Sequence, residues 1–577
     1  RASMLRRAIW LFLTSVAIAS PWTGVCAGES DKAKPVAVAS FAGYNAARTD
    51  VDFLGKISSN PELVAGLEFL IQMATGGAGL EGLDKDRPWG VVVKADPAEA
   101  DAGQLDPKRL MGGYAFLPVT DLDKLLGAFR GAIDAPKVED GFVVVRQNGG
   151  PPNYIKEAGG WAFVANDPKW LADLPDNPLT LLGELAQEYD LAVSFDLAAL
   201  PENIRERAIA KAKADASREL VQKPGEADEE FAARKVVTQQ ALRIASMAVR
   251  ELEQVTLGWV LDAESGKTHL DVSVTARGDT GAAGWFARLE RTKSNFSGFL
   301  MPDAAISGNW SVEFGKANIE GLPTVIDALR SKAIGDIESQ NKSFEEQELA
   351  KKLVNNLLDV AQSTLATGRF DGGMVARLDA DAVTLASGKY VAEGEKIDAT
   401  IKEVVATVGK YEPALIEQLV KLDAAEHNGV RFHRLTLPVT DETENREQIE
   451  RMFGPAIDVV VGVGPESVYA AIGRDALGTL QELIDRSKEN AARTVAPLEF
   501  SLDVRQLAAF VAEYGGGEAE RQQARKLAGV FDEIKGEKDR ITVTAGPIPQ
   551  GVKLRVDVEE GILKALGVLA SQQQTGR

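Results

Sequence analysis

Cysteine and histidine are the scarcest reactive side chains in this sequence. The 577 residues contain one cysteine, Cys26, and three histidines, His269, His427 and His433. A single cysteine cannot form a disulfide within the chain, and the histidines are too scattered to match the ligand spacing of a zinc site. Cys26 also lies in the segment that we predict to be removed, which leaves the mature chain without a cysteine nucleophile.

Local motifs for phosphate binding or nucleophilic catalysis are absent as well. The sequence contains neither a Walker loop nor a Gly-x-Ser-x-Gly nucleophile elbow. Gly462-Val463-Gly464 lacks the third glycine of a dinucleotide motif and leads into a second strand, so we interpret it as part of a hairpin. We therefore predict no catalytic residue, no cofactor and no metal site.

Basic residues are outnumbered by acidic ones, 65 Lys and Arg against 85 Asp and Glu, for a net charge of -20. Such a field repels nucleic acid and anionic lipid surfaces. It favours solubility, cationic partners and divalent ions, and solubility alone explains it most simply. We predict no nucleic acid partner.

The N-terminus has the pattern of a signal peptide over residues 1–27. A basic head, Met4–Arg7, precedes the apolar run Ala8–Ala19, and Val25-Cys26-Ala27 offers small residues for cleavage before Gly28. A lipid anchor on Cys26 and twin-arginine export are the alternatives to general secretion. No later apolar run approaches membrane-spanning length. We expect a polar leader at 28–35 and a protein exported to the periplasm or the exterior.

The remaining chain predicts an α+β fold built from two tandem, related units of mainly antiparallel sheet covered by helices. Two stretches, Tyr154–Leu200 and Ile457–Val511, each contain an alternating strand that ends in an aspartate able to cap a helix. The apolar positions are Leu191, Val193 and Phe195 before Asp196, and Leu498, Phe500 and Leu502 before Asp503. We place the first unit at 36–298 and the second at 299–577.

Helix signals are strongest in two places. Proline in the first turn and Pro224-Gly225 as a break predict a long helical hairpin between Glu202 and Gln254. In the second unit, Ser343 and Glu346 form a capping-box pattern, and Gly368 ends the same helix.

Several groups of residues invite a chemical interpretation, and each has a simpler structural one. His269 and Asp271 share one strand face, an arrangement that can orient a base, but we assign both to solvent because Leu270, Val272 and Val274 point the other way. We interpret the remaining groups as a solvated loop, a turn, a loop and core packing rather than calcium, metal, adhesion or sugar sites. These groups are Asp96, Glu99, Asp101 and Asp106; Asp379 and Asp381; Arg277-Gly278-Asp279; and the tryptophans 89, 161, 170, 259, 285 and 310.

Four stretches of the sequence resemble a family of uncharacterised exported proteins of planctomycete bacteria. The resemblance covers nearly the whole mature chain and implies export, but no activity and no functional residue can be carried over from it. The stretches are Gly82-Leu83-Asp84-Lys85-Asp86-Arg87-Pro88-Trp89-Gly90, Gly160-Trp161-Ala162-Phe163-Val164, Val430-Arg431-Phe432-His433 and Gly464-Pro465-Glu466-Ser467-Val468-Tyr469.

Three functions stay open. The favoured one is a non-enzymatic binding or structural protein of the cell envelope or exterior, with an unknown protein partner. The first alternative is a carrier of an apolar ligand or lipid, held between sheets and helices. The second is a hydrolase whose distant carboxylates leave no local motif.

Overall fold

The protein is α+β, as the sequence predicts. The computed structural model describes residues 35–57, 62–96, 110–147, 149–315, 319, 321–340, 343–379, 382–441, 445–533 and 538–575. Within these ranges the chain forms 17 α-helices and 20 β-strands. Among the same residues, the search for a helix long and apolar enough to cross a membrane finds none. The predicted signal peptide and all but the last residue of the leader lie outside the described ranges.

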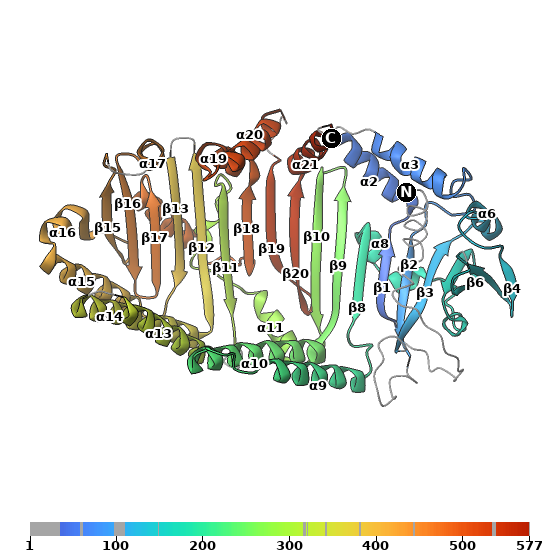
Figure 1. The fold of residues 1–577 in the computed structure, drawn as a ribbon, viewed down its shortest axis with the longest axis horizontal. Helices are drawn as coiled ribbons and strands as arrows, with labels where there is room; N and C mark the ends of the chain where they lie inside the picture. The colour runs from blue at the N-terminus through green and yellow to red at the C-terminus, as the bar shows by residue number, and fades with distance from the viewer. Residues whose placement is uncertain are drawn as a thin grey trace. The chain divides into compact units, whose positions relative to one another are not determined.

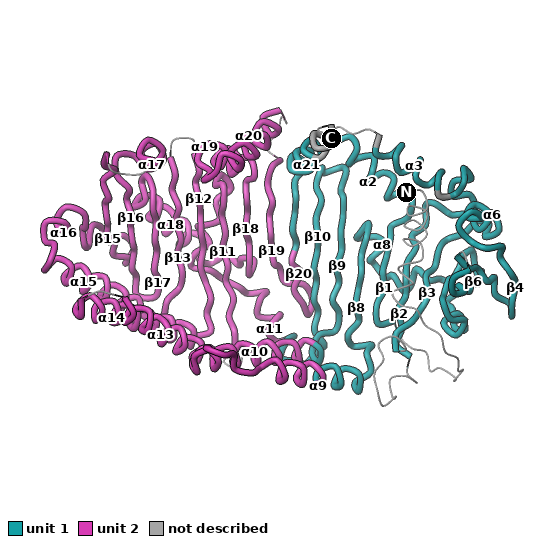
Figure 2. Tube along the Cα trace, in the orientation of Figure 1, with its two compact units in different colours: residues 1–209, 249–283, 555–577 teal, residues 210–248, 284–554 magenta. Residues whose placement is uncertain are grey.

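The chain divides into two compact units (Figure 2). Unit 1 comprises residues 1–209, 249–283 and 555–577, and unit 2 comprises residues 210–248 and 284–554. The C-terminal segment, residues 555–577, therefore belongs with the N-terminal unit. The division expected from the sequence, 36–298 and 299–577, places this segment in the second unit.

Unit 1 is built on ten strands whose described pairings are all antiparallel. Their order across the sheet is β10–β9–β8–β1–β2–β3–β7–β6–β5–β4. The strands are β1 (Pro35–Phe41), β2 (Trp89–Ala95), β3 (Met111–Pro118), β4 (Lys137–Glu139), β5 (Phe142–Arg146), β6 (Pro152–Ala158), β7 (Trp161–Ala165), β8 (Leu191–Asp196), β9 (Leu252–Asp262) and β10 (Lys267–Ala276).

Unit 2 contains nine complete strands, also paired antiparallel. Their order is β19–β18–β11–β12–β13–β17–β16–β15–β14. The strands are β11 (Ile306–Glu313), β12 (Arg369–Asp379), β13 (Ala382–Tyr390), β14 (Val420–His427), β15 (Val430–Pro438), β16 (Ala456–Gly464), β17 (Ser467–Gly473), β18 (Leu498–Asp503) and β19 (Arg540–Ile548). A further strand, β20 (Gly551–Glu559), begins in unit 2 and ends in unit 1.

The order of strands is the same in the two units. Across the sheet, β9 to β4 of unit 1 correspond one by one to β19 to β14 of unit 2, so that each strand of unit 2 has the number of its unit 1 counterpart plus ten. In both, the strand that ends in the predicted capping aspartate lies beside the first strand of the unit: β8 beside β1, and β18 beside β11. Asp503 caps α19 by accepting a hydrogen bond from the Gln506 N–H. Asp196 accepts one from the Ala199 N–H in a turn, and α9 begins only at Glu202, so the prediction that Asp196 caps a helix is wrong.

The helices lie beyond the ends of the strands and against the faces of the sheet (Figure 1). In unit 1, α2 and α21 pack against each other beyond one end of the strands. The helices are α2 (Tyr44–Ile57), α3 (Glu62–Ala74), α6 (Leu122–Ala128), α7 (Leu179–Leu182), α8 (Leu185–Glu188), α9 (Glu202–Glu219), α10 (Asp228–Glu251), α11 (Gly281–Leu289), α13 (Leu322–Ser339), α14 (Phe344–Thr367), α15 (Gly394–Tyr411), α16 (Pro413–Leu419), α17 (Arg446–Phe453), α18 (Ala476–Asn490), α19 (Val504–Tyr514), α20 (Glu518–Glu533) and α21 (Glu560–Thr575).

Both faces of the sheet are covered around β3, β5, β6 and β7 in unit 1. Alternate residues of β7 enter different cores: Trp161 and Phe163 pack with Tyr114, whereas Ala162 packs with Leu125 of α6. This alternation follows from the two-residue repeat of a strand. The sheet is therefore the middle layer of three at this end.

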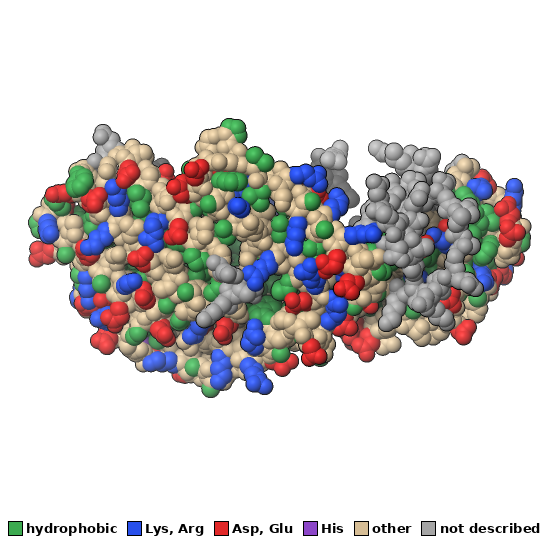
Figure 3. Space-filling view, turned by 90° about the horizontal axis from the view of Figure 1, so that it is seen from below, with side chains coloured by type: hydrophobic (Ala, Val, Ile, Leu, Met, Phe, Trp, Pro, Cys, Tyr) green, Lys and Arg blue, Asp and Glu red, His purple; other side chains and the backbone are tan. Residues whose placement is uncertain are grey.

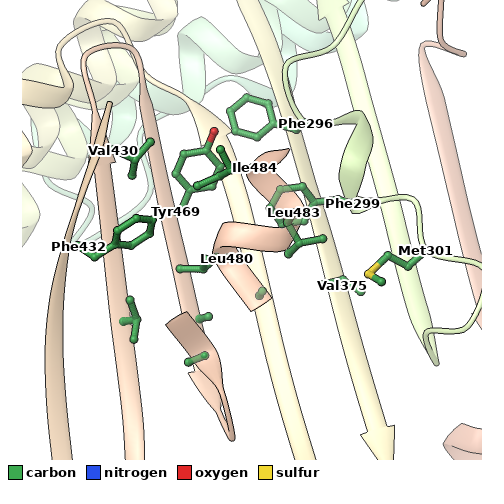
Figure 4. Packing of buried hydrophobic residues seen from close by; sticks show 14 of the residues in the cluster. Phe296, Phe299, Met301, Val375, Val430, Phe432, Tyr469, Leu480, Leu483 and Ile484 are labelled. Atoms are coloured by element: carbon green, nitrogen blue, oxygen red, sulfur yellow. The ribbon is translucent and has the colours of Figure 1, made fainter. Parts of the chain in front are cut away.

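The main core of unit 2 lies where α18 and the short 3-10 helix η2 (Ser297–Phe299) pack on the sheet (Figure 4). Phe299 is fully buried beside Phe296 and Tyr469, with the rings of Phe299 and Tyr469 stacked at 6.5 Å between centroids. A Cβ added to Gly373 would lie 2.6 Å from Phe299, so this contact requires glycine in β12.

Local helix signals are borne out. Ser343 Oγ accepts from the Glu346 N–H, the Glu346 carboxylate accepts from the Ser343 N–H, and Gly368 ends α14 in the left-handed conformation. Two apolar residues of α10, by contrast, lie largely in solvent: Val237 is 54% exposed and Ile244 51%.

Candidate functional site

One face of β1, β8, β9 and β10 in unit 1 carries a continuous apolar area, and we call this area the outer face of unit 1. Thr268 borders it on β10, where its hydroxyl accepts the Trp259 indole N–H at 2.9 Å. Directly paired residues of adjacent antiparallel strands share a face, so the register identifies its members. Leu191, Phe195, Leu257 and Leu270 are 39–46% exposed on it. The full set is Ala37, Ala39, Phe41, Leu191, Val193, Phe195, Val255, Leu257, Trp259, Leu270, Val272 and Val274.

The opposite, inner face of the same strands is buried and carries polar side chains among small apolar ones such as Val38 and Ala192. Ser194 and Thr256 are hydrogen-bonded at 3.0 Å, and Gln254 donates to Ser194 at 2.6 Å. α7 and α8 pack on this side, because a Cβ added to Gly258 would lie 2.3 Å from Tyr189 at the end of α8. Several polar side chains are thus buried opposite exposed large apolar ones, which is the reverse of the usual distribution.

Asp271 is one of these buried polar side chains, although the sequence predicts that it faces solvent. Its side chain is 1% exposed, whereas the neighbouring Leu270 is 46% exposed, so the assignment of Asp271 to solvent is wrong. The Asp271 carboxylate accepts a bidentate pair of hydrogen bonds from Arg555, at 2.8 and 2.7 Å, and a third from the Tyr189 hydroxyl at 3.1 Å. Burial, followed by the charge of Asp271, raises the pKa of Tyr189 above its ordinary value. The described contacts of Asp271 are therefore structural.

Unit 2 has an outer face of the same kind. Met374 is 37% exposed and Leu385 42%. A Cβ on Gly372 would lie 2.7 Å from the Trp310 ring, and one on Gly308 would lie 3.0 Å from the Phe500 ring, so both rings lie against the sheet over glycines. The same face also holds two exposed polar residues of β13, Ser387 opposite Met374 and Lys389 opposite Gly372, so it is apolar only in part. Its apolar positions and glycines are Ile306, Gly308, Trp310, Gly372, Met374, Ala376, Leu385, Leu498, Phe500, Leu502, Ile541, Val543 and Ala545.

The inner face of unit 2 carries a buried polar network around Asp371. The Asp371 carboxylate accepts from Ser294 Oγ at 2.5 Å, from the Asn295 N–H at 3.0 Å and from Arg369 at 2.7 Å. Asn309 Nδ2 donates to Ser294 Oγ at 2.7 Å. This network occupies the side on which η2 packs, so the outer face again lies opposite the covered side.

His433 is a histidine with a hydrogen-bond partner on each ring nitrogen, and no local pattern in the sequence indicates either partner. It is 5% exposed, and its Nε2 lies 2.9 Å from the Asp398 carboxylate. Nδ1 accepts the Asp423 N–H at 3.2 Å, where an irregularity in β14 holds Asp423 at φ +47°. The proton is therefore on Nε2, and both nitrogens are engaged. An imidazole held in this way positions α15 on the sheet and has no free atom to act as a base.

Asp398, Asp423 and His433 also have ligand atoms close enough for a metal ion. Lys402 Nζ, however, lies 3.2 Å from Asp398 and 3.0 Å from Asp423, and Arg431 lies 3.1 Å from Asp398. Burial opposes ionisation of Asp398, but the hydrogen bonds from His433 and Lys402 outweigh it and hold its pKa below the ordinary value. The Lys402 ammonium thus takes the place that a cation would occupy between the carboxylates.

His427 and the described members of the groups singled out in the sequence lie in separate parts of the fold. His427 pairs with Asp485 at 2.7 Å beside the Asn428-Gly429 turn. Asp96 binds Lys169 at 2.7 Å, whereas Glu99, Asp101 and Asp106 lie outside the described residues. Arg277-Gly278-Asp279 follows β10 and runs into α11. Asp379 ends β12, and Asp381 lies outside the described ranges.

The tryptophans divide between core and sheet surface. Trp161 is 1% exposed, as core packing predicts. Trp89 stacks on Phe41 at 4.8 Å and shares a row with Leu191 and Trp259 across neighbouring strands. Trp310 occupies the outer face of unit 2. The sequence could not separate these environments, because alternation marks two faces without saying which is covered.

Among the described carboxyls, Asp50 has a raised pKa. Burial, followed by the charge of Asp190, raises the pKa of Asp50 to about 6. A carboxyl with a raised pKa is one signature of acid–base catalysis, although buried structural carboxyls produce it too.

Charges of both signs are interspersed on the surface. On the side viewed in Figure 3, Lys and Arg side chains lie among Asp and Glu, with apolar side chains between them. The net negative charge is thus not gathered into a patch of one sign on that side.

Comparison with known proteins gives no match to a protein-family model, to a curated protein or to a solved structure.

Proposed function

We propose that this chain is a non-catalytic binding protein that takes an apolar ligand on the outer face of unit 1. The observation that carries the proposal is the reversed sheet, with Leu191, Phe195, Leu257 and Leu270 exposed opposite buried polar side chains. Of the three functions that the sequence leaves open, this combines the favoured binding protein with the carrier of an apolar ligand.

The exposed side chains supply the driving force for binding. Removing a large aliphatic or aromatic side chain from water contributes about 1.5–3 kcal/mol. Contiguous apolar surface of this kind marks a binding surface more often than isolated exposed residues do. Because its members are aliphatic or aromatic, the face offers hydrocarbon contact to the part of the ligand that lies on it.

The test is binding of the uncharged fluorophore N-phenyl-1-naphthylamine to the full chain, followed by displacement with a long-chain monoacylglycerol. We expect Leu257→Lys and Leu270→Lys each to weaken binding about tenfold, because a charge replaces buried hydrocarbon in the complex. Val138→Lys is the matched control, since Val138 is 79% exposed on β4 at the far end of the same sheet.

Unchanged circular dichroism would establish that the variants fold. Absence of binding by the unmodified chain, or equal binding by all three variants, would overturn the proposal. Ester, glycoside or peptide turnover that survives purification and disappears in Asp50→Asn would favour the hydrolase instead.

We also propose that the two units are tandem copies of one fold, with α9 and α10 forming a helical hairpin. The shared strand order supports the first part, as does an aspartate at the end of β8 and of β18 that accepts an N–H three residues later. Arg250 of α10 makes a bidentate pair with Glu206 of α9, at 2.7 and 2.6 Å, which supports the second. Superposition of separately determined unit structures, with Leu191–Phe195 on Leu498–Leu502, is the test.

Export remains part of the proposal. The N-terminal pattern supports removal of residues 1–27 and release into the periplasm or the exterior. Mass spectrometry of the protein from its native cells should find Gly28 as the first residue. A Met4 start or a lipid on Cys26 would contradict this.

A further inference from the structure

We propose that Lys94 is a covalent acceptor site for small aldehydes and ketones, which its amine takes up as imines. Lys94 lies on β2 of unit 1, beside the core that contains Tyr114 and Phe163, and the proposal does not depend on the outer face. The arrangement that carries it is an amine over the ring of a buried tyrosine. Neither the Lys94 amine nor the Tyr114 hydroxyl has a hydrogen-bond or ion-pair partner among the described residues.

Two aromatic side chains flank Lys94. Its directly paired residue on β3 is Gly112. A Cβ added to Gly112 would lie 2.4 Å from the ring of Trp170 in the 3-10 helix η1 (Pro168–Leu171), so the indole fills the place of a side chain beside the lysine. Tyr114 is the diagonal neighbour on the same strand face, and the Lys94 Nζ lies 5.3 Å from the centroid of its ring. The lysine is therefore partly buried against hydrocarbon.

Tyr114 offers a proton donor that lacks an acceptor. The residue is 1% exposed, and its hydroxyl oxygen is buried without a hydrogen-bond partner. Buried polar groups nearly always have such a partner, so an unpartnered one requires an explanation. Burial, followed by the charge of Asp173, raises the pKa of Tyr114 to about 12, and the hydroxyl thus keeps its proton at neutral pH. An oxygen atom bound next to the Lys94 amine would supply the missing acceptor.

The surroundings of Lys94 favour its neutral, nucleophilic form. Burial lowers the pKa of Lys94, and the charge of Asp173, which acts in the opposite direction, does not offset the effect of burial. The nearby charged groups around η1 are paired among themselves: Lys169 Nζ lies 2.7 Å from Asp96 and 4.0 Å from Asp167. Because a desolvated lysine is a nucleophile towards carbonyl carbon, Lys94 suits imine formation.

The reaction is a condensation that needs no oxidant and no reductant. The Lys94 nitrogen forms a bond to the carbonyl carbon, and the π electron pair moves to the oxygen, which takes up a proton. Loss of water then gives the imine, and both hydrogens of that water come from the amine. The Tyr114 hydroxyl lends a proton to the oxygen and recovers one from the nitrogen, so it is unchanged at the end. The neighbouring rings favour a carbonyl compound with an aromatic or short hydrocarbon substituent.

Reductive labelling of the full chain tests the site. Benzaldehyde and sodium cyanoborohydride at pH 7 convert each imine into a benzylamine, which peptide mass spectrometry locates. We expect Lys94 to be labelled about tenfold faster than Lys137, because its surroundings favour the neutral amine. Lys137 is the internal control, since it is exposed on β4 of the same sheet. Lys94→Arg should remove the label at this position alone.

Two variants distinguish a reactive amine from one that is merely accessible. Asp173→Asn removes a charge that favours the ammonium form, so it should speed labelling of Lys94 about twofold and leave Lys137 unchanged. Tyr114→Phe should slow labelling of Lys94 about fivefold, because the proton donor is lost. It should not lower the free energy of unfolding, since the deleted hydroxyl has no partner to lose.

The outcomes decide the proposal without involving the apolar ligand. Equal labelling of Lys94 and Lys137 would overturn it, and so would a Lys94 rate that Asp173→Asn leaves unchanged. A Tyr114→Phe variant that loses stability and is labelled at the unmodified rate would show the hydroxyl to be structural, and would also overturn the proposed arrangement. Leu257→Lys, which tests the outer face, should leave labelling of Lys94 unchanged, so that either proposal can fail alone.

Discussion

The two units share an order of strands but hold their inner faces with different polar contacts. In unit 1, buried Asp271 is bound by Arg555, which lies 284 residues later in the chain. In unit 2, buried Asp371 is bound by Ser294, Asn295 and Arg369, two of which lie just before η2. The same strand order thus accompanies two different sets of donors to a buried carboxylate, one from a distant part of the chain and one from nearby segments.

The largest expected effect on the free energy of unfolding comes from removing one buried aromatic ring from the core of either unit. Phe163→Ala in unit 1 and Phe299→Ala in unit 2 each remove a fully buried ring, and each should lower the free energy of unfolding by about 4 kcal/mol. Urea unfolding, followed by circular dichroism, measures the loss. Phe344→Ala is the control, because Phe344 is 77% exposed on α14 and its loss should be small. A similar loss in all three would contradict the assigned cores.

The next effect distinguishes the polar contacts of unit 1. Arg555→Met leaves Asp271 buried without its guanidinium partner and should lower the free energy of unfolding by about 3 kcal/mol. Adding Asp271→Leu should restore part of the loss, because no buried charge then remains. Arg250→Met removes an exposed pair with Glu206 and should change little. If the double variant is no better than the single one, the loss does not come from the stranded carboxylate.

A smaller effect compares helix caps. Asp121 caps α6 in unit 1 by accepting from the Lys124 N–H, and Ser343 caps α14 in unit 2 within a capping box. Asp121→Ala and Ser343→Ala should each reduce the free energy of unfolding by about 1 kcal/mol. Glycine at either position should cost less than alanine, and thermal unfolding of the four variants would reveal the opposite order if capping were unimportant.

The smallest effect compares two carboxyls with opposite pKa shifts. Asp50 in unit 1 has a pKa raised to about 6, so its contribution to stability is fully present below its unfolded pKa and is lost as the pH rises through 6. Asp50→Asn should therefore stabilise the chain at pH 8, by about 0.7 kcal/mol after discounting for solvent screening, and have no such benefit near pH 3.

Asp398 in unit 2 should behave in the opposite way. Its pKa is lowered, so its contribution is present above the unfolded pKa and is lost as the pH falls through the folded one. Asp398→Asn should destabilise the chain at pH 7 and do so less in strong acid. The same pH dependence for both variants would contradict one of the two assignments.

The sequence predicts features that depend on neighbouring residues. The capping box of Ser343 and Glu346 and the glycine end of α14 follow from positions within one helix. The α+β class and the alternating strands β8 and β18 follow from the two-residue repeat.

Features that depend on distant contacts were not predictable. Alternation separates Leu270 from Asp271 but does not say which side α7 and α8 will cover, and that choice decides where the candidate site lies. The pairing of His433 with Asp398 joins residues 35 positions apart and depends on an irregularity in β14. Neither contact leaves a local signal.

The position of Arg555 also sets the order in which the protein can be completed. A chain is synthesised from its N-terminus, so β1 to β10 are available long before residues 555–577. Until then, Asp271 lacks the guanidinium that neutralises it, and α2 lacks its neighbour α21. Unit 2, whose last residue is 554, has all of its residues before then. The unit that begins first is therefore finished last, and a chain truncated before Arg555 should retain unit 2 in a better state than unit 1.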